Sequence, residues 1–233
     1  MKFNKKRVVV VSLVVSLLAI LSFGTLAWFN ASDSVTNTFH VADSDDDDTK
    51  ADFAIDVKET VPGEEEGTDE IVDDGHTFND ILPGDVLLKK PVIKNTGLYD
   101  QWVRVNVLIS KDFADQVAEE QGTTFDLISL DEIIDGIPYA KLEANREVGA
   151  ADTYTDYYVY AYYLAEPLAP EAEITMFEAV KIPCSFTQDD MIYGEDGFQI
   201  IVKADAVQAG NLEGPASAAF ACANWEVGTN YEK

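Results

Sequence analysis

The sequence predicts an all-β fold, an antiparallel β-sandwich with a short helical insertion. Several short segments follow strand patterns, and turn formers such as LPGD and NTG separate them. The hydrophobic content of 47% and the aromatic content of 11% are too high for a disordered acidic chain. A chain of this length buries one good core, so we expect a single globular domain over residues 53–225, followed by a short tail at 226–233.

Residues 1–27 have the pattern of a removable export signal. Four basic residues precede an almost wholly apolar run from Val8 to Phe23, and the segment ends in the small-residue pattern TLA. We therefore expect a signal peptidase to cut between Ala27 and Trp28, so that the chain contacts the membrane only transiently. The alternative is a retained anchor helix, because the apolar run approaches the roughly 18 to 20 residues that span a bilayer.

A strand pattern begins directly after the expected cut, without a linker. In an extended conformation Val35, Phe39 and Val41 fall on one face of residues 28–41, with Trp28 and Phe29 at the tip. Such an amphipathic N-terminal arm is predicted to add to an open sheet edge. It either folds back onto its own domain or pairs with a neighbouring subunit.

The charge is strongly negative and uneven. The chain has 16 basic and 43 acidic residues, and because the expected signal contains four basic residues and no acid, a chain that starts at Trp28 has a net charge of −31. This charge excludes nucleic acid as a partner. The acids concentrate in a predicted linker at 42–52 and in a predicted exposed loop at 62–75. An EF-hand template fails around Gly75, so loose binding of divalent cations remains the minor alternative to solvated loops.

Five segments are predicted to form strands. The segment Trp102–Ser110 has the clearest alternation and should place Val103, Val105, Val107 and Ile109 inward. The five are Phe53–Thr60, Trp102–Ser110, Tyr157–Leu164, Ile174–Ile182 and Phe198–Val207. Helical spacing in Lys111–Gly122 and Asp126–Gly136 predicts that the insertion at 111–136 packs against the sandwich.

Six of the ten tyrosines fall within ten residues, from Tyr154 to Tyr163. Alternation along a strand divides them between two faces, which favours packing in the core and between strands. The alternative is an aromatic ladder that stays exposed in the monomer and forms a contact between subunits.

The two cysteines, Cys184 and Cys222, permit one disulfide bond in an exported chain. Such a bond would stabilise the fold by very roughly 3 to 4 kcal/mol. Both residues also fit the alternative of buried free thiols that behave as small hydrophobic residues.

Four segments, in this order along the chain, resemble the TasA/camelysin family of secreted Gram-positive matrix proteins. They are GTLAWFNASDSVTNTFHV, LPGDVLLKKPVIKNTGLYDQWVRVNV, MFEAVKIP and VKADAVQAGNLEG with its following ANW. The resemblance implies a jelly-roll-like sandwich, export through a dedicated signal peptidase, and polymerisation into extracellular biofilm fibres. It also favours donation of the arm at 28–41 to the next subunit, head to tail. The acidic loop and the insertion at 111–136 depart from the family pattern.

Camelysin-like proteins have also been described as metallo-endopeptidases, which makes an enzyme the remote alternative. A zinc hydrolase needs about three protein ligands and a general base, commonly as His-Glu-x-x-His. The chain contains only His40 and His76, neither in such a motif, and it lacks a Gly-x-Ser-x-Gly elbow. We therefore predict no catalytic residue, no metal and no cofactor.

The sequence thus supports a secreted structural subunit located in the extracellular matrix or at the cell surface. Its expected partners are further copies of itself, and the signal peptidase during export. A secreted monomeric adhesin or ligand-binding sandwich remains the alternative with the same fold.

Overall fold

The structure is a computed structural model, and it describes residues 30–34, 37–38, 53–63, 69–73, 75–78, 80–150, 154–187, 197–210, 212, 214–223, 225 and 227. The expected signal and its cleavage site at Ala27 and Trp28 lie outside the described residues. So do the acidic linker, His40 and the other predicted assembly residues Phe29, Val35, Phe39 and Val41. In the described part of the chain, no helix has both the length and the apolar character needed to cross a membrane.

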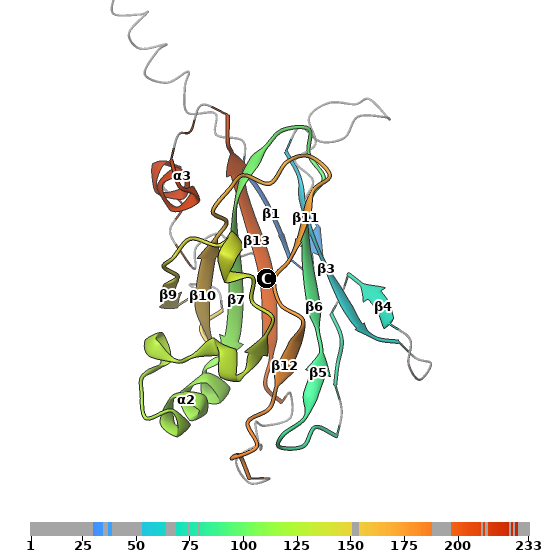
Figure 1. Cartoon of the computed structure of the whole chain (residues 1–233), viewed down its shortest axis with the longest axis vertical. Helices are drawn as coiled ribbons and strands as arrows, with labels where there is room; N and C mark the ends of the chain where they lie inside the picture. The colour runs from blue at the N-terminus through green and yellow to red at the C-terminus, as the bar shows by residue number, and fades with distance from the viewer. Residues whose placement is uncertain are drawn as a thin grey trace, which may run out of the picture.

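In the described part of the chain, three antiparallel sheets and two short helices form a β-sandwich-like arrangement (Figure 1), which confirms the predicted all-β class with helical insertions. The six-stranded sheet has the order β2 (Asn37–Thr38), β1 (Asn30–Ser34), β13 (Ile200–Gln208), β7 (Gln101–Ser110), β10 (Tyr157–Tyr163) and β9 (Glu147–Ala150). The four-stranded sheet has the order β11 (Glu173–Thr175), β6 (Lys90–Asn95), β3 (Ile55–Pro62) and β4 (Asp69–Val72). The third sheet has the order β5 (Val86–Leu88), β12 (Ala179–Lys181) and β8 (Ile134–Asp135). The helices are α2 (Lys111–Glu120) and α3 (Ala216–Cys222).

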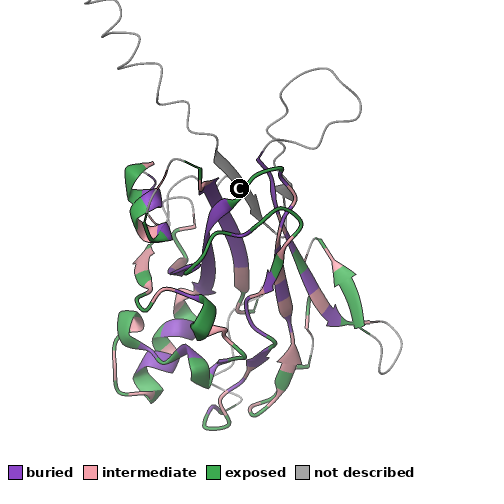
Figure 2. Ribbon diagram, turned by 45° about the horizontal axis from the view of Figure 1, so that its top comes forward, coloured by how far each residue is buried: buried purple, intermediate pink, exposed green. Residues whose placement is uncertain are grey.

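The main core lies between the six-stranded and four-stranded sheets. On β7 the predicted inward residues Val103, Val105, Val107 and Ile109 are all buried in it. The alternating burial of β3 places Ile55 and Val57 on the facing side. Buried residues line the paired strands in Figure 2, whereas β4 and the outer sides of the helices are exposed.

Strand β7 differs from the prediction on its other face, which is buried as well. A second apolar cluster forms there from Trp102, Tyr163 and Val207 with Phe220 of α3 and Trp225. The C-terminal segment that contains α3 therefore covers the outer face of the six-stranded sheet, so that β7 is enclosed on both sides.

The insertion is only half helical. Helix α2 forms as predicted and buries Phe113 and Val117 against the main core. The predicted helix at 126–136 is wrong: two 3₁₀ turns, Phe125–Leu127 and Leu130–Glu132, precede β8 there. The side chain of Gln121 explains part of this difference, because its amide bonds both the N–H and the carbonyl of Ser129 at 2.7 and 3.1 Å. The Ser129 N–H is then unavailable for a helical hydrogen bond, and the Ser129 carbonyl also accepts the Glu132 N–H at 3.3 Å, as in a 3₁₀ turn.

Two further segments differ from their predictions. The predicted strand Ile174–Ile182 is divided, and its halves β11 and β12 belong to different sheets. Within the predicted loop at 62–75, residues Asp69–Val72 form the edge strand β4 and pair with β3. The acidic residues of this segment correctly predicted that β4 is exposed. Acidic composition does not indicate whether the backbone pairs with a neighbouring strand.

The tyrosine-rich strand packs mainly inside the protein. Tyr160, Tyr162 and Tyr163 are buried, while Tyr157 and Tyr158 are partly buried. The Tyr160 hydroxyl donates to the carbonyl of Phe125 at 2.8 Å, and Phe125 stacks on Tyr158 with ring centroids 3.9 Å apart. This arrangement favours core packing over an exposed aromatic ladder.

Cys184 and Cys222 are both free and exposed, so the structure contains neither the predicted disulfide bond nor the alternative pair of buried thiols. Cys184 lies in the turn after β12, and its Cβ faces Gly84 in the loop before β5. Cys222 ends α3, which lies at the opposite end of the molecule from that turn (Figure 1). A disulfide bond requires Cα atoms within about 7 Å, which this placement does not provide.

Candidate functional site: the β13 edge and the network beneath the C-terminal segment

The N-terminal arm pairs with β13 in its own chain. Strand β1 runs antiparallel to β13 over five residues, from Asn30 opposite Val207 to Ser34 opposite Lys203. It then turns back into β2, with Asp33 opposite Thr38 and Ser34 opposite Asn37. The backbone of the arm is therefore a hairpin, and not the single extended strand predicted for residues 28–41.

Strand β13 is the platform on which the arm lies. On its far side it pairs with β7 over nine residues, from Ile200 opposite Ile109 to Gln208 opposite Gln101. One face of β13 contributes Val202, Ala204 and Ala206 to the main core. Because β13 has β7 on one side and β1 on the other, departure of the arm would leave a long β13 edge unpaired.

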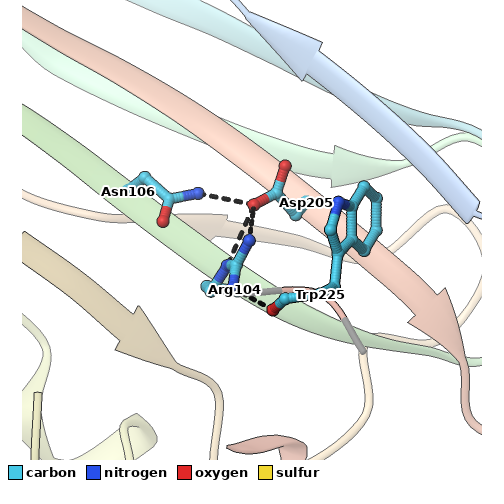
Figure 3. A network of polar contacts seen from close by, with 4 residues as sticks. All are labelled: Arg104, Asn106, Asp205 and Trp225. Carbon is cyan, nitrogen blue, oxygen red and sulfur yellow. Dashed lines mark hydrogen bonds and ion pairs between the residues drawn. The ribbon is translucent and has the colours of Figure 1, made fainter. Parts of the chain in front are cut away.

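The other face of β13 carries a buried polar network (Figure 3). The carboxylate of Asp205 accepts hydrogen bonds from Arg104 Nε at 2.9 Å and Nη2 at 2.7 Å. Asn106 Nδ2 donates to the same oxygen at 2.8 Å. Arg104 Nη1 donates to the carbonyl of Trp225 at 2.8 Å, which ties the C-terminal segment to the sheet.

Aromatic rings complete the surroundings of Arg104. Its guanidinium carbon lies 4.9 Å from the ring centroid of Phe220 and 5.9 Å from that of Trp225. The side chain of Arg104 is 0% exposed and that of Asp205 is 2% exposed, so water is excluded from the ion pair. A buried pair of this kind persists only when further hydrogen bonds satisfy both charged groups, as they do here.

The network lies directly beside the arm. Asp205 is opposite Ser32 of β1, and the neighbouring Lys203 is opposite Ser34. Lys203 is also buried; its Nζ donates to the Tyr154 hydroxyl at 2.8 Å and lies 4.2 Å from the centre of that ring. The β13 edge is thus held by side-chain contacts to β7, Tyr154 and the C-terminal segment as well as by its backbone pairing.

A second buried ion pair lies at the end of the other sheet. Glu59 is on the core-facing side of β3, and its Oε1 accepts a hydrogen bond from Lys89, which separates β5 from β6. Within the described residues its other oxygen, Oε2, has no hydrogen-bond partner. Burial lowers the pKa of Lys89, and the charge of Glu59 offsets this only in part.

The structure describes one of the two histidines considered as metal ligands, His76. His76 is exposed and packs edge-on against Phe78, with ring centroids 4.7 Å apart. Among the residues that the structure describes, no three side chains of His, Cys, Asp or Glu are arranged to hold a metal ion.

Sequence reasoning missed the Arg104–Asp205 network. A signal was present, because RVN and KAD place charged or amide residues at alternate positions of two otherwise apolar segments. Alternation of this kind is typical of a sheet with one solvent-exposed face, and it does not predict that the C-terminal segment covers that face. The fold and this site together define a β-sandwich-like protein with a strand-pairing edge. Comparison with protein-family models, curated proteins and solved structures finds no match to this chain.

Proposed function

We propose that the protein is a secreted structural subunit that polymerises into extracellular fibres by exchanging its N-terminal arm between neighbouring copies. The observation that carries this proposal is the pairing of β1. The arm's only β-ladder to the rest of the described fold is five residues of pairing with β13. A strand with so short a ladder, at the start of the chain, is well placed to pair with an equivalent edge on a second copy.

The chain length between the arm and the sandwich permits this exchange. Residues 39–52 connect β2 to the first described residue of the sandwich, Phe53. Fully extended, this segment would span up to roughly 45 Å. A head-to-tail contact that does not close into a ring generates a filament, so each subunit would donate one arm and accept another. The TasA-like segments of the sequence favour the same assembly.

The alternative is a secreted monomer that retains its arm and acts as an adhesin or ligand-binding domain. The cis pairing of β1 with β13 favours it, since the same hydrogen bonds form within one chain. The two functions differ in one measurable property, which is whether fibre growth requires the arm to leave its own β13.

A reversible lock on the arm tests the proposal. Ala31 and Ala206 are opposite one another across β1 and β13, and both are small. We would introduce Ala31→Cys and Ala206→Cys together with Cys184→Ser and Cys222→Ser, whose native thiols are exposed. Oxidation should fix the arm to its own chain and abolish fibres seen by electron microscopy, and reduction should restore them.

The reduced protein is the matched control, because its sequence is identical. A variant with Ala206→Cys alone checks that oxidation has no other effect. Fibre growth at the same rate with the disulfide bond formed would show that the arm is not exchanged. Absence of fibres in the reduced and the wild-type protein alike would favour the monomeric alternative.

A further inference from the structure

A groove lies at the end of the six-stranded sheet where β1 begins and β13 ends. Its volume is about 510 Å³, and the residues that line it include Tyr99, Asp100, Trp102, Pro167, Gln208 and Leu212. Two aromatic rings, a proline and a leucine make it largely apolar, while Asp100 contributes an exposed carboxylate. This composition fits a ligand that combines an aromatic group with a positive charge.

The walls of the groove are held in place by the fold. The Ala209 N–H donates to the Asp100 carbonyl at 3.0 Å, and the Trp102 indole N–H donates to the Leu212 carbonyl at 3.3 Å. The ring of Tyr99 stacks on Phe53, with centroids 5.6 Å apart, yet Tyr99 remains 53% exposed. The groove is therefore formed before any ligand arrives, with an aromatic surface open to solvent.

The strand register directs the start of the chain toward this groove. Asn30 is opposite Val207, and β13 runs on from Val207 to Gln208, which lines the groove. Because the two strands are antiparallel, Asn30 is the described residue of β1 that lies nearest to the Gln208 end of β13. The two residues that precede Asn30 are Trp28 and Phe29.

Cleavage after Ala27 would give Trp28 a free α-amino group. Its unperturbed pKa is about 7.7 to 8.0, so the group is mostly cationic at neutral pH. Asp100, an acidic residue among the aromatic residues that line the groove, would be an oppositely charged partner for such a terminus. The uncleaved precursor offers a peptide bond at that position and lacks the charge.

On this basis we infer that the groove receives the tip of the processed arm, with Trp28 and Phe29 against Tyr99 and the new α-amino group against Asp100. The inference rests on the proposed function for the identity of the donor. In the monomer the tip comes from the same chain, and in the fibre it comes from the neighbouring subunit. Removal of the signal then creates the group that the groove recognises.

Zero-length cross-linking of the purified secreted protein tests this contact. N-terminal sequencing should first show a chain that starts Trp28-Phe29. A carbodiimide joins a touching amine and carboxylate as an amide with loss of water, so mass spectrometry should find the Trp28 terminus linked to Asp100. Asp100→Asn should abolish the product, and Glu120→Gln, which alters an exposed acid on α2, should leave it.

Mixing chains with natural nitrogen and ¹⁵N shows which chain supplies the tip. We expect a product within one chain in the monomer and between chains in the fibre. Absence of a Trp28–Asp100 product in both states would overturn the assignment of the groove. A product confined to single chains within fibres would support the groove but contradict arm exchange, so the two proposals fail in different ways.

Two substitutions extend the test to fibre growth. Tyr99→Ala removes the exposed ring, and Gly210→Leu should fill the groove, because a Cβ at Gly210 meets only the end of the Gln208 side chain, at 2.9 Å. Each should slow seeded growth about tenfold or more, the equivalent of about 1.4 kcal/mol. Tyr139→Ala is the control, since Tyr139 is 50% exposed and lies in the 3₁₀ turn Tyr139–Lys141, which does not line the groove. Growth of both groove variants at the wild-type rate would overturn the inference.

Discussion

Arg104 illustrates how a strongly charged chain accommodates charge in its interior. Its guanidinium donates to a carboxylate and to a backbone carbonyl and lies beside two aromatic rings, which are contacts that offset the burial of a cation. A buried ion pair is weak evidence for stability in itself, but breaking one leaves an isolated charge, which is costly.

For Arg104→Met we expect the free energy of unfolding to fall by about 3 to 5 kcal/mol, because Asp205 stays buried without its cation. Combining it with Asp205→Asn should cost less than the sum of the single changes. Urea unfolding measures each variant. Lys94→Met is the control, since Lys94 and Glu171 are 38% and 50% exposed, and it should cost under about 1 kcal/mol. Equal losses from Arg104→Met and Lys94→Met would show that the network does not stabilise the fold.

Lys89 should make stability depend on pH in the alkaline range. Burial lowers its pKa below the ordinary lysine value of about 10.4, so between the folded-state pKa and that value the unfolded chain binds more protons. Stability should therefore rise with pH in that window, and this contribution is lost as pH falls through the folded-state pKa. The difference in unfolding free energy between wild type and Lys89→Met should increase from pH 7 to pH 10, by at most about 1.4 kcal/mol per pH unit. A flat or falling difference would contradict the lowered pKa.

At the scale of elements, the sequence predicted strands with regular alternation, but it did not predict which segments cover the faces of the sheets. Alternation in Trp102–Ser110 predicted β7 and its core face correctly, because period-two spacing depends only on local sequence. The same pattern could not show that α3 and Trp225 enclose the other face, since that contact joins segments about 120 residues apart, as in the Arg104–Trp225 hydrogen bond. The spacing of leucine and isoleucine at 126–136 indicated a helix. In the structure Leu127 is 70% exposed, and the hydrogen bonding of Gln121 to Ser129 outweighs the helical spacing.

The candidate site was predictable only in outline. An arm that adds to a sheet edge follows from the strand pattern after Ala27, and β1 does pair with an edge, as the intramolecular alternative described. The partner strand, its register and the hairpin turn depend on the folded sheet. For the same reason the placement of Cys184 and Cys222 far apart could not be derived from their number.

Helix α3 should depend on its aromatic residue more than on its own propensity. It is seven residues long, too short to be stable alone, and Phe220 is 1% exposed against Trp225 and Tyr163. Phe220→Ala should lower the free energy of unfolding by about 3 to 5 kcal/mol and raise hydrogen exchange in the C-terminal segment. Leu127→Ala, at a 70% exposed position, should change the free energy by less than about 0.5 kcal/mol. Unchanged exchange in Phe220→Ala would show that the segment is held by other contacts.

At the scale of the whole molecule, net charge opposes association. The full chain has a net charge of −27, so copies of it repel one another, and the repulsion reaches about 10 Å at 0.1 M salt and about 30 Å at 0.01 M. Exposed acids on β4 and α2 contribute to this field in the described part of the fold.

We therefore expect fibre yield to rise with ionic strength, on acidification, or on addition of divalent cations, through screening, protonation and bridging respectively. Light scattering and electron microscopy measure the yield. A comparison of the fibre yields in choline chloride and in magnesium chloride at equal ionic strength distinguishes charge screening from bridging by divalent cations. A constant yield between about 0.01 M and 0.5 M salt, and from neutral to mildly acidic pH, would show that charge does not control assembly.

The two exposed thiols allow the orientation of each subunit in a filament to be determined. Cys184 follows β12 and Cys222 ends α3, at opposite ends of the molecule (Figure 1), and neither is committed to a disulfide bond. With Cys184→Ser or Cys222→Ser, a maleimide-gold particle marks one end of every subunit. In a head-to-tail polymer the marks would repeat once per subunit and point the same way along its whole length. The polarity of growth would then become directly visible at each tip.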